Sequence, residues 1–287
     1  MSKLFPVYDI YNIDNSSAQR GLMIENFASY LEKHYQQLHK PHRHSFYHLV
    51  LFTAGGGTHT IDFVTFPVKP AQIYFMIPGQ VHSWHFEGEV DGYIVHFNES
   101  LFTTFLRDGQ YLERFSFFSG NSEDGVINLP AEVYQTIQRL FASMLVESQP
   151  LDLIRLRLLE LFITVEQLSM AKTEKNIPLQ KLSVVKTFKQ LIDHRFRDLK
   201  LPKEYAELLH VTPNYLNALC QDLLGKTAGD LIRDRVILEA KRLLVNADLT
   251  VGEIAYELNF ADNSYFTRFF RKHTGITPEE FRKKIPA

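Results

Sequence analysis

The chain has 287 residues, 45% of them hydrophobic and 22% charged, a composition that excludes a disordered or fibrous protein. A single cysteine excludes an internal disulfide, and no run of about 18 apolar residues or secretory leader is apparent, so we expect a cytoplasmic protein without a membrane span. Residues 1–175 carry 13 Lys and Arg against 19 Asp and Glu, whereas residues 176–287 carry 18 against 14. An acidic front and a basic rear are expected to have different partners.

Residues 46–97 read as a series of short strands. Apolar, β-branched and aromatic runs such as FYHLVLFT, THTIDFVTF, IYFMI and GYIVHF are interrupted by Gly or Pro. Interruptions every 8–12 residues are typical of an antiparallel sandwich or barrel, so we expect separate short strands here.

Helical spacing follows in residues 130–149 and again after Pro150. In the second helix apolar residues recur seven apart and form a seam of nearly three heptads: Leu151, Ile154, Leu158, Leu161, Val165 and Leu168. Leu156, Leu159 and Ile163 form a second stripe. A helix that is apolar on two sides needs two partners, so we expect its own barrel and a second subunit. Burial within one domain is the alternative.

The polar stretch AKTEKNIP indicates a linker. We place it at residues 171–180, between a first domain at 1–170 and a second at 181–287.

The second domain contains an internal repeat. EYAELLHV at 204–211 aligns with EIAYELNF at 253–260, and Tyr215 and Gly225 then align with Tyr265 and Gly275 after one inserted residue. Each copy predicts two short helices joined by a turn, which is the helix-turn-helix plan for placing a helix in the DNA major groove. The joining segment, residues 228–247, predicts a helix about 30 Å long, close to the ~34 Å that separates groove faces one turn apart.

The second helix of the second copy has a polar face opposite an aromatic one made by Tyr265, Phe266, Phe269 and Phe270. Its polar side chains fall into two groups. Those suited to base edges are Asn263, Ser264, Thr267 and Arg268, and those suited to phosphates are Arg271 and Lys272. A solvated charged face is the alternative.

The first copy offers a weaker polar face of Asn214, Asn217 and Gln221, with Thr212 as the helix cap. Ala218 stands where the second copy has Arg268. We therefore expect lower affinity for DNA from this half.

Residues 181–285 resemble the DNA-binding domain of the AraC/XylS family of bacterial transcription regulators. The resemblance rests on EIAYELNFADNSYFTRFFRKHTGITPEEFR, through Ile254, Ala255, Phe260, Tyr265, Phe266, Phe270, Gly275, Pro278, Phe281 and Arg282. Asn259 replaces a usual Gly, Ala218 a usual Arg and Cys220 a usual Phe. The front of the chain, through HRHSFYHLVLFTAGGGTHTIDF and IPGQVHSW, resembles the family's cupin-like effector-binding arm.

Several histidines of the front domain are candidates for a site. His42 and His44 share one side of a strand, and with His48 and His82 they resemble the cupin metal pattern, although His48 stands where a Glu is usual. The alternative, which we adopt, is a metal-free pocket for an organic effector such as a sugar, with no cofactor. Its predicted wall is His44, Phe46, His48, His82, Trp84 and Tyr93. We expect His59, His85 and His96 only to line the barrel or its surface.

We therefore predict an α+β protein: an N-terminal antiparallel cupin-like β-barrel with a helical dimerisation segment, then an all-α double helix-turn-helix domain. The resemblance implies a homodimer that binds double-stranded promoter DNA, responds to a small effector and contacts RNA polymerase. A metal-dependent cupin enzyme with a helical accessory domain is the competing class, and a non-catalytic cupin scaffold is a third.

Overall fold

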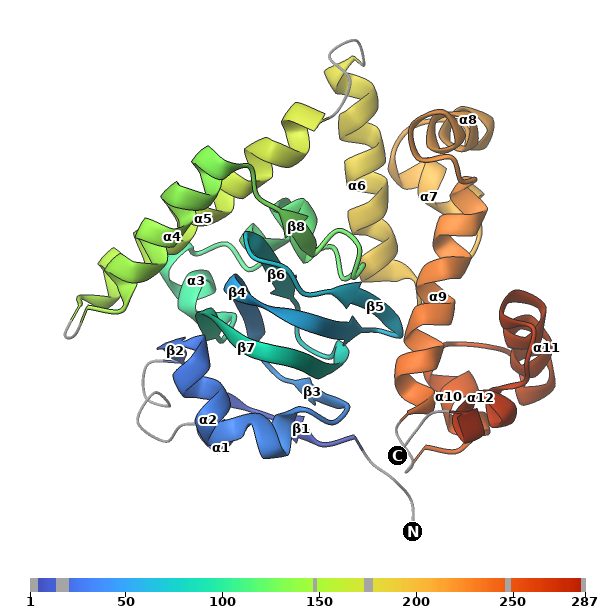
Figure 1. The fold of residues 1–287 in the computed structure, drawn as a ribbon. Helices are drawn as coiled ribbons and strands as arrows, with labels where there is room; N and C mark the ends of the chain where they lie inside the picture. Colours follow the sequence, from blue (N-terminus) through green and yellow to red (C-terminus); the bar gives the residue numbers. More distant parts are fainter. Residues whose placement is uncertain (1–4, 14–20, 147–148, 173–177, 246–248, 285–287) are drawn as a thin grey trace. The chain divides into compact units, whose positions relative to one another are not determined.

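The computed structural model describes residues 5–13, 21–146, 149–172, 178–245 and 249–284 (Figure 1). It divides into two compact units, residues 6–173 and residues 1–5 with 174–287. The first unit is built on β-sheet, and the described part of the second consists of helices. None of the helices in these ranges combines the length and the apolar character needed to cross a membrane.

One sheet of eight strands organises the first unit, in the order β1-β3-β7-β4-β6-β8, with β2 also paired to β7 and β5 to β4. The strands are β1 (Val7–Tyr8), β2 (Leu22–Asn26), β3 (His42–His44), β4 (Tyr47–Ile61), β5 (Val64–Pro67), β6 (Gln72–Met76), β7 (Val81–Phe97) and β8 (Val126–Asn128). The pairs are antiparallel apart from β1 with β3, which is parallel. The predicted α+β class with an antiparallel front domain is confirmed.

Strands β4 and β7 run through the glycines at which the sequence predicted breaks. Their register shifts between Phe52 and Ala54 and between Ala54 and Gly56, so the pairing is irregular there but continues on both sides. At Gly57, φ is 91° and an added Cβ would lie 2.2 Å from the carbonyl oxygen of His85, so no side chain fits between the strands. The prediction of separate short strands was wrong here, because both strands continue through these glycines.

The two faces of the sheet bury separate apolar clusters. One cluster packs the sheet against α3 (Ser100–Leu106), α4 (Ala131–Met144), α5 (Leu151–Lys172) and the 3-10 turns η2 (Tyr111–Arg114) and η3 (Ser116–Phe118). On the other face lies α2 (Phe27–Leu38), whose Phe27 ring contacts both Phe52 and Trp84 with centroids 5.4 Å apart. A short helix, α1 (Ile10–Ile13), follows β1.

The heptad seam of α5 lies inside its own domain. Leu158, Leu161 and Val165 have no exposed surface, and Ile154 is 6% exposed. Leu151 and Leu168 pack half-buried against the same cluster. The structure therefore corrects the prediction that this seam contacts a second subunit, since the sheet and the 3-10 turns already cover it.

A different stripe of α5 is exposed. Leu153, Leu156 and Ile163 are 37%, 54% and 47% exposed, whereas Leu159, predicted to share their side, is 9% exposed. The helix is thus apolar on two sides, as the sequence indicated, but the side left for a partner is the opposite one.

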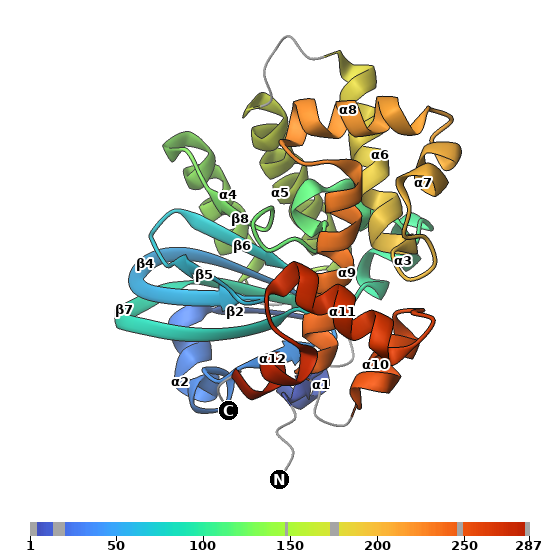
Figure 2. The ribbon, with the colours of Figure 1, turned by 90° about the vertical axis from the view of Figure 1, so that its right-hand side faces the viewer.

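The second unit begins with α6 (Leu179–Arg195). Its other helices are α7 (Pro202–Leu208), α8 (Pro213–Leu224), α9 (Ala228–Leu244), α10 (Val251–Glu257), α11 (Asn263–Thr274) and α12 (Pro278–Lys284). Helices α7 and α8 lie toward one end of α9, and α10 to α12 lie toward the other (Figure 2). One apolar cluster contains buried residues of α7, α8, α9, α10 and α11, so α9 connects the two groups of helices through a shared core.

Two predicted boundaries change. Helix α9 has 17 residues, about 25 Å, and not the ~30 Å expected from residues 228–247. Its predicted end, Ala247, lies outside the described residues. Because α5 continues to Lys172 and α6 begins at Leu179, the predicted linker at 171–180 narrows to 173–178, of which residues 173–177 are not described.

Candidate functional site

Helices α8 and α11 begin and end by the same devices. The side chain of Asp262 accepts a hydrogen bond from the Tyr265 N–H at 2.7 Å, and Thr212 does the same for α8, as predicted. Gly225 and Gly275 end the two helices with left-handed φ angles of 68° and 80°. Caps at both ends define the length and direction of each helix.

Aromatic side chains fix α11 from behind. Phe266 and Phe270 are fully buried, and the Phe260 ring contacts Phe266 and Phe269 at 5.2 and 5.1 Å. Tyr265, predicted to belong to this aromatic face, is 51% exposed. Phe266 and Phe270 are therefore the buried aromatics, with Phe269 half-buried beside them, and together they orient the opposite side of the helix outward.

The polar side chains predicted for α11 lie on that outer side. Those exposed are Asn263, Ser264, Arg268, Arg271 and Lys272, and Thr267 is half-buried. The Thr267 hydroxyl donates to the Asn263 Oδ1 at 3.4 Å. Asn263 and Ser264 open the helix, Thr267 and Arg268 lie one turn on, and the two further cations follow. The uncharged hydrogen-bonding side chains therefore lie at the start of the helix, and the cations lie further along it.

The outer side of α8 has a different chemistry. Asn214, Asn217 and Gln221 are exposed, as expected. The Asn217 Oδ1, however, accepts a hydrogen bond from the Ala228 N–H at 2.9 Å. Asn217 thus also fixes the start of α9, a role that sequence reasoning missed.

Arg282, part of the family-like motif, has a structural role. Its guanidinium donates to the carbonyl oxygens of Leu244 at 3.2 Å and Leu249 at 2.7 Å. It therefore satisfies the carbonyl group of the last residue of α9 and one in the segment that precedes α10.

In the first unit, five of the six predicted pocket residues come together. His44 contacts Phe46 with centroids 4.4 Å apart and His48 at 5.3 Å, and Trp84 lies 5.4 Å from His82. All five are buried, and so is His42. Tyr93 is the exception. It lies on the other face of β7 and stacks on Phe141 of α4 at 5.4 Å, so we remove it from the pocket.

Two histidines that the sequence assigned only to the lining of the barrel belong to the same group. The His59 Nε2 lies 3.0 Å from the His82 Nδ1, and the His48 Nδ1 lies 2.8 Å from the His96 Nε2. The available signal was parity, since His96 shares the parity of His82 and Trp84, and β7 keeps its alternation along its length. His85, of the other parity, is exposed. We name His42, His44, His48, His59, His82 and His96 the histidine cluster; each is at most 2% exposed.

Burial keeps the histidine cluster neutral. Loss of solvation lowers the pKa of His42 to about 4 and that of His48 to about 3. Burial, reinforced by neighbouring histidines, also lowers the pKa of His44, His82 and His96 well below the ordinary value. Near pH 7 the cluster therefore presents neutral imidazoles, which are both hydrogen-bonding groups and metal ligands.

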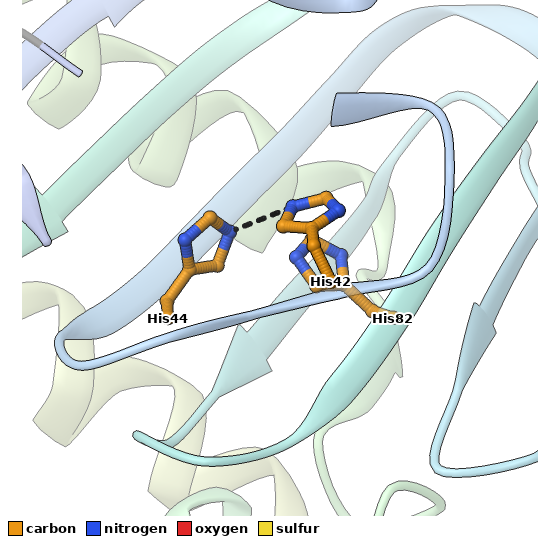
Figure 3. A group of neighbouring side chains, drawn as sticks. All are labelled: His42, His44 and His82. Carbon is orange, nitrogen blue, oxygen red and sulfur yellow. Dashed lines mark hydrogen bonds between the residues drawn. The ribbon is translucent and has the colours of Figure 1, made fainter. Parts of the chain in front are cut away.

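Three members lie close enough to share one ion. One ring nitrogen from each of His42, His44 and His82 lies within 4.8 Å of the other two, and Figure 3 shows the three rings gathered together. His42 and His44 come from β3, and His82 from the start of β7, directly opposite His42 in the sheet register.

The chain thus combines a β-rich domain that holds a buried polar site with a helical domain that holds two helix-turn-helix pairs. A model described as a helix-turn-helix domain matches residues 205–284, and one described as an AraC-like ligand binding domain matches residues 27–161. The chain belongs to the AraC/XylS family of transcription regulators.

Individual relatives resemble different parts of the chain. The HTH-type transcriptional regulator YijO of Escherichia coli is 30% identical over 102 residues, 36% of this chain and 36% of that protein. The HTH-type transcriptional activator RhaR of Mannheimia succiniciproducens is 21% identical over 263 residues, 88% of this chain and 90% of that protein. Among solved structures, the C-terminal domain of the response regulator AraT from Geobacillus stearothermophilus is 28% identical, with a TM-score of 0.34, and the match covers 36% of this chain and 87% of that one.

The matches to YijO and to the Bacillus subtilis regulators YesN and YisR cover 36%, 24% and 41% of those proteins. The chain thus spans less than half the length of these curated relatives.

Proposed function

We propose that this protein is a transcription regulator that binds promoter DNA sequence-specifically through α8 and α11 and responds to a small ligand in its β-rich domain. The observation that carries the proposal is the outer side of α11. Arg268, Arg271 and Lys272 are exposed there, while the opposite side is anchored by buried aromatics.

Each polar side chain predicted for the outer side of α11 has a role in this proposal. Arg268 reads guanine through a bidentate contact, and Asn263 pairs with adenine; Ser264 and Thr267 bond to base edges nearby. Arg271 and Lys272 contact phosphates and set the register on the duplex. In α8, Asn214 and Gln221 contact bases directly or through water, and Asn217 contributes its amide group. With Ala218 in place of an arginine, α8 supplies the weaker half of the interface.

The ligand acts by shifting populations. Occupancy of the site lined by His44, Phe46, His48, His82 and Trp84 favours one arrangement of the protein, and that arrangement fits its operator and RNA polymerase differently. The protein binds its ligand without turning it over. As a bacterial DNA-binding regulator, it works in the cytoplasm.

A homodimer is part of the proposal, with its contact moved to the exposed stripe of α5. Leu153, Leu156 and Ile163 are three exposed apolar side chains along the 22-residue helix α5, about 33 Å long. An identical stripe on a second copy is complementary to it under two-fold symmetry. Two copies would then present four second helices to a pair of half-sites.

Selection from genomic DNA tests the function. Fragments bound by the purified full chain are separated, sequenced and remeasured by fluorescence anisotropy at several salt concentrations. We expect the enriched fragments to share a motif whose elements lie about one helical turn, ~10 base pairs, apart. If the bound fragments match the input library in sequence, the protein is not a sequence-specific regulator.

A further inference from the structure

The histidine cluster is too closely packed to hold an organic molecule between its rings. The ring centroids of His42 and His82 are 4.2 Å apart, those of His44 and His82 are 4.8 Å apart, and those of His44 and His48 are 5.3 Å apart. These are distances of rings in contact with one another. An occupant shared by these rings must therefore be of the size of an ion.

The hydrogen bonds of His42 leave a lone pair for such an ion. Its Nδ1 lies 2.7 Å from the carbonyl oxygen of Lys40, and since a carbonyl can only accept, Nδ1 carries the proton. The Nε2 of neutral His42 is then an acceptor, and it lies 3.2 Å from the Nε2 of His44. Two imidazole nitrogens bound to one ion at 2.0–2.1 Å with tetrahedral angles lie about 3.4 Å apart.

The two histidines that the sequence did not place in the site orient the others. His59 bonds to the Nδ1 of His82, and His96 bonds to the Nδ1 of His48. In each case one ring nitrogen is held and the other, Nε2, is left. Metal-binding histidines are held in this way, by a bond from the nitrogen that does not bind the metal.

Buried nitrogens without partners are the second, independent observation. Within the described residues, the ring atoms His44 Nδ1, His48 Nε2 and His82 Nε2 are buried without a hydrogen bond. The same is true of one nitrogen each of His59 and His96. Native interiors rarely leave polar atoms unpaired, so several in one cluster indicate a missing partner.

We propose that His42, His44 and His82 bind a divalent first-row transition-metal ion, with His48 as the fourth ligand. Neutral imidazoles suit Zn²⁺, Co²⁺, Ni²⁺ or Cu²⁺, whereas Mg²⁺ and Ca²⁺ require oxygen ligands, which this group lacks. His48 completes the set because its ring lies 5.3 Å from both His44 and His82 and its Nε2 has no partner among the described residues. We assign His42, His44 and His82 as the primary ligands because one ring nitrogen of each already lies close to the other two.

The metal ion would be the ligand to which the proposed regulator responds. Only this regulatory role of the ion rests on the proposed function. Metal binding itself is measured without DNA, so the two ideas fail separately.

The binding experiment uses the untagged full chain, stripped of metal with a chelator and titrated with Zn²⁺ and Co²⁺. We expect one ion per chain by elemental analysis, a Co²⁺ absorption spectrum of a tetrahedral site, and a higher melting temperature with metal. X-ray absorption of the Zn²⁺-loaded protein should show a nitrogen shell at about 2.0–2.1 Å with imidazole scattering. A stoichiometry near zero, or a shell containing sulfur, overturns the proposal without any variant.

Variants locate the site. His44→Gln and His82→Gln should each weaken Zn²⁺ binding by about 100-fold or more, since a ligand change should cost at least as much as the 10- to 100-fold of an orienting residue. His85→Gln is the matched surface control, because His85 lies on β7 like His82 but is exposed. This variant should bind Zn²⁺ as the wild type does. His96→Gln is the buried control and should lose less than either ligand variant. If both ligand variants keep wild-type affinity, the assignment is wrong.

The DNA arm repeats the anisotropy measurement with the selected fragments, with and without Zn²⁺. A change in affinity with Zn²⁺ in the wild type, absent in His44→Gln, makes the ion the signal. If the protein binds Zn²⁺ but no DNA, the proposed function fails and the metal site stands.

Discussion

His210 and Asn259 adopt the same left-handed backbone conformation, with φ angles of 54° and 56°, at matching positions of the two helix-turn-helix copies. Each follows the first helix of its pair, and in each copy the next residue donates its N–H back to that helix, Val211 to Ala206 and Phe260 to Ala255. The family usually places Gly at the second of these positions. Both turns therefore adopt a left-handed conformation at a residue other than Gly, whose Cβ makes that conformation unfavourable.

His210→Gly should stabilise the helical unit by about 0.5–1 kcal/mol. A left-handed conformation costs a residue with a Cβ about 1–2 kcal/mol, and the greater unfolded-state entropy of Gly offsets part of that gain. Asn259→Gly should gain less, because Asn tolerates this conformation better than most residues. Both side chains are exposed, so little packing is lost. Urea unfolding followed by circular dichroism measures the change.

His210→Ala is the matched control for this prediction. It removes the imidazole but keeps the Cβ, so it should not stabilise the protein. Equal stability of the Gly and Ala variants would show that the backbone conformation is not the source of the effect.

Arg268→Ala should weaken binding to the selected operator by about 1–3 kcal/mol and relax the preference at one base pair. Arg271→Ala should weaken binding to operator and random DNA alike and lower the salt dependence by the equivalent of about one phosphate contact. Arg139→Ala, an exposed arginine on α4, removes the same charge from the other unit as a control. An operator affinity in Arg268→Ala equal to that of the control would remove the base-reading role.

The helical unit was the more predictable one. Its repeat appears in the letters themselves, because each short helix needs apolar residues at the same positions to pack on one cluster, and each is followed by a turn and a capping residue. Local sequence was sufficient at Thr212, because a Thr followed by Pro213 predicted a helix start that the structure confirms. The bond from Ala228 to Asn217 was out of reach, because it joins two helices across a turn.

The β-rich unit depends on pairing that the sequence does not state. Alternation grouped His82 with Trp84, but residues 81–97 were predicted as separate strands, so the alternation was not carried through to Tyr93 and that residue was placed on the wrong face. The prediction that the α5 seam contacts a second subunit was wrong for a related reason. A heptad repeat marks a side that must be covered, yet Leu158 and Leu161 are covered by their own sheet. Periodicity identifies an apolar side and leaves its partner open.

The exposed stripe of α5 gives a direct test of the dimer. Leu156→Glu combined with Ile163→Glu should yield a folded monomer in sedimentation analysis, because charges would then face one another across the two-fold contact. Leu158→Glu is the contrasting change. Leu158 is fully buried, so that variant should lose about 4 kcal/mol or more, or fail to fold. A double variant that sediments as a dimer would place the contact elsewhere.

Asn217 separates a structural role from a DNA contact. Its Oδ1 accepts the hydrogen bond from the Ala228 N–H, one of the N-terminal donors of α9 that helical bonding leaves unpaired. Asn217→Ala should therefore lower the free energy of unfolding by about 1 kcal/mol. Asn217→Asp keeps an acceptor at the same place and should retain the wild-type stability in urea.

The two variants should rank differently on DNA. Asn217→Asp introduces a negative charge on the outer side of α8, so it should lower affinity for operator and random DNA, most strongly at low salt. Asn217→Ala adds no charge and should weaken operator binding less. Because Asp is the more stable variant and the weaker binder, the two effects cannot be confused. Equal losses of stability in both variants would mean that the bond to Ala228 does not fix α9, whereas unchanged DNA affinity in Asn217→Asp would remove α8 from the interface.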